Sequence, residues 1–218
     1  MEFIDWGLIP YSDAYNRQKE LFEAALRNKI NREPVRNQVI FCEHPHVITI
    51  GKNGLFSNLL FSEKILQEKN VELHRVDRGG DVTYHGPGQM VVYPILDLEF
   101  FSIGLKEYIH RLEEIIIRTI AGFGIRGERL QDATGVWLDS DKPGKARKIA
   151  AIGVRSSRYV TMHGLALNVN TDLSYFQLIN PCGFTDKGVT SMEKELGCRI
   201  EREKPKDLLV TNFQLFFN

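Results

Sequence analysis

The sequence predicts an α+β fold in which a mixed β-sheet is flanked by helices within a single domain covering residues 1–218. Two observations support this prediction. Segments with strand-like character and segments with helical periodicity are intermixed, without the regular strand–helix–strand rhythm of a doubly wound sheet. No stretch has the composition of a linker, and a chain of 218 residues suits one large domain better than two.

Four segments have the apolar periodicity of helices. They are residues 12–32, 62–70, 105–120 and 206–217. The third is the clearest, because its apolar residues recur every three or four positions and Gly122 and Gly124 follow its end. The first is expected to begin at a capping Ser12 or Asp13 and to end before Pro34.

Seven short apolar runs are expected to be strands. They are residues 39–43, 47–50, 71–76, 90–96, 134–138, 148–155 and 161–170, and we expect the last two to pair with each other. The main connections are expected to be irregular. They comprise a glycine-rich stretch at 78–89, an exposed polar turn at 139–147 and a loop at 180–185.

Charge and cysteine usage limit the classes of function. Lys plus Arg and Asp plus Glu both number 28, and a chain without excess positive charge is a poor candidate for non-specific nucleic-acid binding. The three cysteines, Cys42, Cys182 and Cys198, do not form the pattern of a disulfide framework, which favours a reducing compartment. The N-terminal residues lack the features of a secretory signal, and no run approaches the roughly 20 apolar residues of a membrane span. We therefore expect a cytoplasmic protein with no membrane or nucleic-acid partner.

The glycine-rich stretch is the first candidate for chemistry. Residues 78–89 contain four glycines together with Arg78, Thr83, Tyr84 and His85. Glycine permits positive φ and close approach of a backbone to a ligand, but the same composition also suits a tight connection between two strands. The spacing matches neither a phosphate-binding loop nor a dinucleotide-binding fingerprint.

A cysteine in a turn is the second candidate. In Asn180-Pro181-Cys182-Gly183-Phe184 a thiol lies between a proline and a glycine. Nucleophilic cysteines occur more often in partly exposed loops with an electropositive neighbour, whereas structural cysteines are usually buried on a strand or helix. Cys42 lies in an apolar run and is expected in the core, and Cys198 has no supporting context.

Two further strands carry polar groups beside small residues. Lys148 opens the run 148–155, where it is either a surface lysine at a strand edge or a cation beside an apolar cleft that favours a neighbouring thiolate. His163 is either a base or a hydrogen-bonded structural histidine. Ala151, Gly153 and Gly164 suggest space for a ligand chain along these strands.

Metal and serine chemistry have little support in the sequence. His44, His46, Glu43 and His74 do not form a metal-binding motif, and neither an H-E-x-x-H nor a C-x-x-C pattern is present. The G-x-S-x-G pattern of serine hydrolases is also missing. We therefore expect no metal site.

Together, four stretches resemble the lipoyl(octanoyl) transferase family of lipoate biosynthesis in their residues, order and spacing. They are Arg78-Gly79-Gly80 with Thr83-Tyr84-His85-Gly86-Pro87-Gly88-Gln89, Lys148-Ile149-Ala150-Ala151-Ile152-Gly153, His163-Gly164-Leu165-Ala166 with Asn168, and Asn180-Pro181-Cys182-Gly183. The resemblance extends over residues 5–196. Asp81 stands where many members have glutamine, and the turn 139–147 is longer and more charged than usual.

This resemblance implies a fold shared with biotin and lipoate protein ligases, no cofactor, and a catalytic pair formed by Cys182 and Lys148. It implies that octanoyl-acyl carrier protein is the donor. The acceptors would be lipoyl domains of 2-oxoacid dehydrogenases and the glycine cleavage H protein. The implied acyl pocket is lined by Arg78, Gly79, Gly80, Asp81, Val82, Thr83, Tyr84, His85, Ala151, Ile152, Gly153, Gly164, Leu165 and Ala166.

Two other functions stay open at this point. One is an ATP-dependent lipoate-protein ligase on the same fold, which would not require the cysteine turn. The other is a non-catalytic domain that binds acyl carrier protein or a free acyl chain, which would require neither Cys182 nor Lys148.

Overall fold

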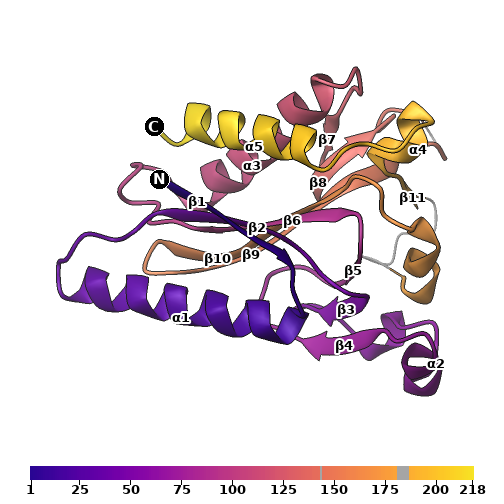
Figure 1. Ribbon diagram of the computed structural model, residues 1–218, viewed down its shortest axis with the longest axis horizontal. Helices are drawn as coiled ribbons and strands as arrows, with labels where there is room; N and C mark the ends of the chain where they lie inside the picture. The colour runs from indigo at the N-terminus through magenta and orange to yellow at the C-terminus, as the bar shows by residue number, and fades with distance from the viewer. Residues whose placement is uncertain (143, 181–186) are drawn as a thin grey trace.

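A large mixed sheet with helices on both faces forms the centre of the protein (Figure 1). The computed structural model describes residues 1–142, 144–180 and 187–218, so the predicted nucleophile Cys182 lies outside the described residues. The strand order of this sheet is β1-β2-β6-β10-β9-β8-β7, with β11 paired to β9. Its strands are β1 (Glu2–Leu8), β2 (Gln38–Glu43), β6 (Gln89–Ile95), β7 (Glu128–Leu130), β8 (Ala133–Leu138), β9 (Arg147–Ser157), β10 (Val160–Asn168) and β11 (Gly188–Val189).

Helices cover the two faces of the large sheet (Figure 1). On one face lies α1 (Tyr11–Ile30), whose Phe22 and Ala25 pack with residues of β2 and β6. On the other face lie α3 (Leu105–Ala121) and α5 (Glu203–Phe216), which pack against each other and against the sheet. The interior strand β6 is therefore buried on both faces, which explains why residues 90–96 form a continuous apolar run.

A second, smaller sheet corrects the expectation of one sheet. Its order is β4-β3-β5, with β3 (Val47–Ile50) between β4 (Glu72–Arg75) and β5 (Val82–His85). The strand β5 lies inside the glycine-rich stretch that we expected to be irregular. It forms because Val82–His85 pairs antiparallel with β3. The glycines lie outside this strand, at its two ends.

The expected elements are confirmed with small shifts of their ends. All four helices are present, including the short α2 (Glu63–Glu68), and the predicted pairing of 148–155 with 161–170 is the antiparallel contact of β9 with β10. The helix α5 begins three residues earlier than expected and has Pro205 in its first turn, where proline is tolerated. The turn expected at 139–147 ends where β9 begins at Arg147.

Several short elements were missed in the sequence. They are β1, β7, β11, the helix α4 (Met192–Leu196) and the 3₁₀ turns η1 (Phe56–Asn58) and η2 (Leu173–Leu178). Each is short or partly exposed, so its apolar pattern is weak. None of the helices in the described part of the chain has the length and apolar character needed to cross a membrane.

Candidate active site

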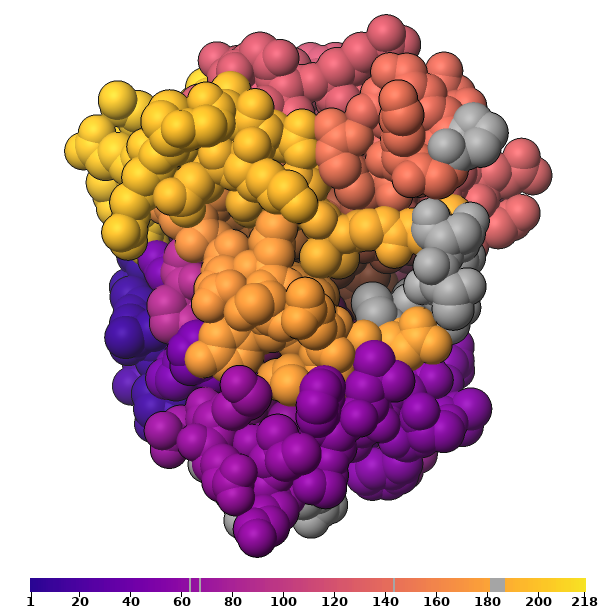
Figure 2. Space-filling model, turned by 90° about the vertical axis from the view of Figure 1, so that its right-hand side faces the viewer, coloured from indigo at the N-terminus to yellow at the C-terminus, as the bar shows by residue number. Residues whose placement is uncertain are grey.

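A cavity of about 400 Å³ lies between the large sheet and the small sheet. Figure 2 shows a hollow on the face of the molecule where residues 170–180 and the segment beginning at Lys187 approach each other. Strands β5, β6, β9 and β10 supply most of the lining, and Tyr11 at the start of α1 adds to it. The cavity therefore forms where the two sheets meet.

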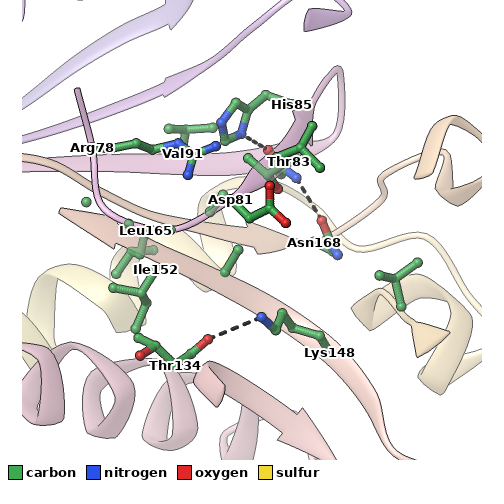
Figure 3. Close-up of a pocket in the computed structure, with 18 of the residues that line it drawn as sticks. Arg78, Asp81, Thr83, His85, Val91, Thr134, Lys148, Ile152, Leu165 and Asn168 are labelled. Carbon is green, nitrogen blue, oxygen red and sulfur yellow. Dashed lines mark hydrogen bonds between the residues drawn. The ribbon is translucent and has the colours of Figure 1, made fainter. Parts of the chain in front are cut away.

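Most of the predicted site residues line this cavity (Figure 3). They are Arg78, Gly80, Asp81, Val82, Thr83, His85, Lys148, Ala151, Ile152, Gly153, Gly164, Leu165 and Ala166. Ala151 and Ala166 are opposite each other in the β9–β10 register. Their small side chains leave an apolar floor between the polar groups.

Gly79 and Tyr84 are the two predicted lining residues that do not line the cavity. The backbone N–H of Gly79 donates to the carbonyl of Val154 at 2.9 Å, which ties the glycine-rich stretch to β9. Because side chains alternate along a strand, Tyr84 points away from the cavity when Thr83 and His85 point toward it. Tyr84 is fully buried behind β5, where a hydrogen bond of 2.8 Å joins its hydroxyl to Nδ1 of His46.

Gly164 is required for packing within the protein and Gly153 is tightly packed, although we expected both to leave room for a ligand. A Cβ atom on Gly153 would lie 3.0 Å from the carbonyl oxygen of Gly79. A Cβ atom on Gly164 would lie 2.1 Å from the carbonyl oxygen of Val92 on the neighbouring strand β6. These glycines therefore let the cavity walls approach each other closely.

Replacing Gly164 by alanine is expected to destabilise the fold by about 1–3 kcal/mol, because β10 must shift away from β6 to remove the overlap. Urea denaturation followed by circular dichroism measures this change. Gly188→Ala is the matched control, because its Cβ would meet Arg147 at an ordinary 3.7 Å. Equal stability of the two variants would contradict the packing role of Gly164.

Lys148 lies beside the cavity at the start of β9 (Figure 3). Its strand is an interior strand between β10 and β8, so Lys148 is not at a sheet edge. The Nζ atom donates to the carbonyl of Thr134 at 3.2 Å and lies 4.6 Å from the ring centroid of Trp137. Both contacts come from β8, and together they orient the amine in the lining of the cavity.

The segments on either side of residues 181–186 are both anchored near the cavity. On the preceding side, the backbone N–H of Asn180 donates to the carbonyl of Asn58 at 2.8 Å, and the side chain of Asn58 donates to the lining residue Asp81 at 2.7 Å. On the following side, Lys187, Gly188 and Val189 line the cavity, and β11 pairs with β9 in parallel. Val189 is the register partner of Lys148.

A buried polar network borders the cavity on the side of β5 and β10. The Gln89 amide nitrogen donates to Oδ1 of Asn168 at 2.9 Å and to the carbonyl of Tyr84, so its oxygen accepts from Nδ1 of His85 at 2.7 Å. Asn168 in turn donates to the carbonyl of Thr190 at 2.9 Å. We did not assign Gln89 or Thr190 to the site from the sequence. For Gln89 the available signal was its place at the end of the glycine-rich stretch that carries the family resemblance, directly before the apolar run 90–96.

Two buried histidines are expected to make the protein less stable at mildly acidic pH. Burial lowers the pKa of His85 to about 3 and that of His44 to about 4, whereas a histidine in the unfolded chain titrates at about 6.5. Below pH 6.5 the unfolded chain therefore binds protons that the folded protein excludes. Each histidine then removes up to about 1.4 kcal/mol of stability per pH unit as the pH falls toward 4.

Urea denaturation at about pH 7, 6 and 5 measures this slope. We expect His85→Gln to flatten it, and His110→Gln to leave it unchanged because His110 is exposed on α3. A slope that is the same in wild type and His85→Gln would exclude His85 as a source.

His163 is a hydrogen-bonded, buried histidine that also lines the cavity. Its Nε2 lies 2.8 Å from Oδ1 of Asp77, and Asp77 also forms an ion pair with Arg155. Burial is the main cause that lowers the pKa of His163, whereas the hydrogen bond to Asp77 opposes this shift. The hydrogen bond expected of a structural histidine is therefore present, and His163 also lies in the cavity lining, where a base would be placed.

No cluster of three or more histidine, cysteine or acidic side chains that could hold a metal ion occurs within residues 1–142, 144–180 and 187–218.

Comparison with known proteins gives a consistent result. A model of the lipoyl protein ligase A/B catalytic domain matches residues 12–214. The chain is 58% identical over 205 residues to an octanoyltransferase of Bacteroides fragilis, covering 94% of this chain and 92% of that protein. It is 56% identical over 213 residues to an octanoyltransferase of Parabacteroides distasonis, and the alignment covers 98% of this chain and 96% of that protein.

Solved structures show the same fold at low sequence identity. A bipartite lipoate protein ligase from Thermoplasma acidophilum aligns with a TM-score of 0.73 at 12% identity, covering 99% of this chain and 82% of that chain. A biotin protein ligase from Aquifex aeolicus aligns with a TM-score of 0.55 at 11% identity, and the alignment covers 99% of this chain and 69% of that chain. The expected ligase-like fold is confirmed. The chain therefore belongs to the lipoyl protein ligase A/B catalytic-domain family and, within it, to the octanoyltransferases, which are acyltransferases of protein lipoylation.

Proposed function

We propose that this octanoyltransferase takes its acyl group from octanoyl-acyl carrier protein, carries it as a thioester on Cys182, and passes it to a lysine of a lipoyl domain. The observation that supports this route best is the position of Lys148. Its amine lies in the lining of an apolar cavity, and its backbone is paired with the segment that follows the cysteine turn.

In the first step, the Cys182 thiolate attacks the carbonyl carbon of the octanoyl thioester, and the phosphopantetheine sulfur of the carrier leaves as a thiol after taking a proton from the Lys148 ammonium, which becomes a neutral amine. The positive charge of Lys148 favours the thiolate over the thiol. The contacts of Lys148 with Thr134 and Trp137 keep that charge beside the cavity. A thioester donor is already activated, so this step needs no ATP.

In the second step, the amine of the acceptor lysine attacks the new thioester, an amide forms, and the sulfur of Cys182 leaves. A proton must be removed from the attacking amine, and Lys148 in its neutral form is our candidate base. Lys148 then supports the thiolate in the first step and accepts a proton in the second.

The apolar part of the cavity suits an eight-carbon chain. Val91, Ala151, Leu165 and Ala166 line it, and the alanines leave space that larger side chains would fill. Burying such a chain contributes about 5 kcal/mol, at about 0.8 kcal/mol per methylene.

The partners follow from this chemistry. The Thermoplasma ligase belongs to a lipoylation system that includes its E2 lipoyl domain. We propose lipoyl domains as acceptors here as well, among them those of 2-oxoacid dehydrogenases and the glycine cleavage H protein. A thiol nucleophile must stay reduced, so we propose the cytoplasm as the compartment.

Intact-protein mass spectrometry tests the proposal. The protein is mixed with octanoyl-acyl carrier protein in the absence of ATP, and we expect a mass gain of one octanoyl group that maps to Cys182. Adding a lipoyl domain should then remove the adduct and octanoylate one lysine of the domain. Product formation without any adduct on Cys182, or only when ATP is present, would exclude the thioester route and favour the mechanism of the ATP-dependent ligases.

A further inference from the structure

Thr190 is held by three hydrogen bonds to three different elements. Its backbone N–H donates to the carbonyl of Lys148 at 2.9 Å, and its carbonyl accepts from the side chain of Asn168 at 2.9 Å. Its hydroxyl donates to Oε1 of Glu195 on the short helix α4. The side chain of Thr190 is fully buried, so these bonds are shielded from water.

Glu195 connects Thr190 to the strand that carries Lys148. Arg147, the residue before Lys148, donates to both oxygens of Glu195, with Nε–Oε1 at 2.7 Å and Nη2–Oε2 at 2.6 Å. Arg147 also forms an ion pair with Asp139. A bidentate arginine–carboxylate pair fixes orientation as well as distance. The carboxylate of Glu195 therefore joins Arg147 on β9 to Thr190 in the segment after β11.

We propose that Arg147, Glu195 and Thr190 act as positioning residues that hold the segment 187–190 in register with Lys148. We call these three residues the clamp. The segment 187–190 follows the cysteine turn in the chain, and it reaches β9 at Arg147 and Lys148. By fixing this segment, the clamp ties the chain that follows the cysteine turn to the strand that carries Lys148. The inference rests on the proposed function, because it gives Cys182 and Lys148 their roles.

The position of the clamp distinguishes it from an ordinary surface ion pair. The side chains of Arg147 and Glu195 are 27% and 18% exposed, and their common partner Thr190 is buried. An exposed ion pair contributes little to stability, because water and salt screen its charges. A clamp that sets the geometry of two reacting groups acts on the rate, because displacement by about 1 Å costs on the order of a hundredfold.

Single-turnover kinetics test the clamp. Octanoyl-acyl carrier protein is mixed with excess enzyme, and the rates of enzyme acylation and of transfer to a lipoyl domain are measured. We expect Thr190→Val and Glu195→Gln to slow acylation by about tenfold to a hundredfold with little change in substrate KM. Thr190→Ser keeps the hydroxyl and should restore the wild-type rate. The double variant Thr190→Val/Glu195→Gln should be no slower than the slower single variant, since both remove the same link.

Asp5→Asn provides a matched control. Asp5 on β1 accepts from both terminal nitrogens of Arg202, at 2.8 and 2.9 Å, and Arg202 is also 27% exposed. This pair does not involve the segment 187–190, so its loss should leave acylation unchanged. Thermal unfolding of all variants shows whether each is folded. If Thr190→Val does not fold, the acylation rate of Glu195→Gln tests the clamp in its place.

The clamp would be overturned if Glu195→Gln were acylated at the wild-type rate. It would also be overturned if Thr190→Ser and Thr190→Val lowered the acylation rate equally. Cys182→Ala and Lys148→Met in the same assay separate this failure from a failure of the proposed function. If those two variants keep full activity, the proposed chemistry is wrong. If they lose activity and Glu195→Gln does not, only the clamp is wrong.

Discussion

Replacing Cys182 by alanine is expected to abolish octanoyl transfer, lowering its rate by roughly 10⁴-fold or more. Without the sulfur no acyl-enzyme can form, and the acceptor lysine would have to attack the carrier thioester directly. Transfer of octanoyl groups to a lipoyl domain measures the loss, and circular dichroism shows whether the variant is folded.

Cys198→Ala is the matched control for this variant. Cys198 is exposed and does not line the cavity, so its loss should leave the rate unchanged. Cys42 is unsuitable as a control because it is fully buried in the core between α1 and the large sheet. If Cys182→Ala transfers octanoyl groups at the wild-type rate, covalent catalysis through this residue is excluded.

Replacing Lys148 by methionine is expected to lower the rate of octanoyl transfer by about 10²–10⁴-fold, the range typical for loss of a positioned acid or base. Methionine keeps much of the apolar volume and removes the charge and the hydrogen bond to Thr134. Both half-reactions should slow, because Lys148 supports the thiolate in the first and takes a proton in the second. Stopped reactions analysed by mass spectrometry measure acylation of the enzyme and its discharge separately.

Lys145→Met is the control for charge alone. Lys145 is exposed in the turn before β9 and is not among the lining residues of the cavity. We expect its variant to retain the wild-type rates of both half-reactions. If Lys148→Met retained them too, Lys148 would have no role in proton transfer or in activation of the thiol.

Local sequence patterns were sufficient for the larger elements. The helix α3 was predicted from the helical spacing of its apolar residues, and β6 from its continuous apolar run. Both patterns depend on residues that are neighbours in the chain, so they are visible without knowledge of the fold. The strand β5 was missed because glycines flank it and its identity as a strand depends on pairing with β3.

The candidate site was predicted in part. The family resemblance carried by the four stretches implied acyl-transfer chemistry, and most of the predicted lining residues do line one cavity. The direction in which Tyr84 points could not be predicted, because it depends on which face of β5 meets the large sheet. The role of Gly164 was also hidden, since it depends on the carbonyl of Val92 in a strand that is distant in sequence.

By itself, the sequence determined the fold class, the main helices and strands, the family, and the candidate pair of Cys182 and Lys148. The tertiary structure decided which polar groups share the cavity and what holds them. It joins Gln89 to Asn168 across 79 positions of the chain, and Asp77 to His163 across 86. Periodicity reflects contacts within one helix or strand, whereas these hydrogen bonds exist only because folding brings distant strands to one place.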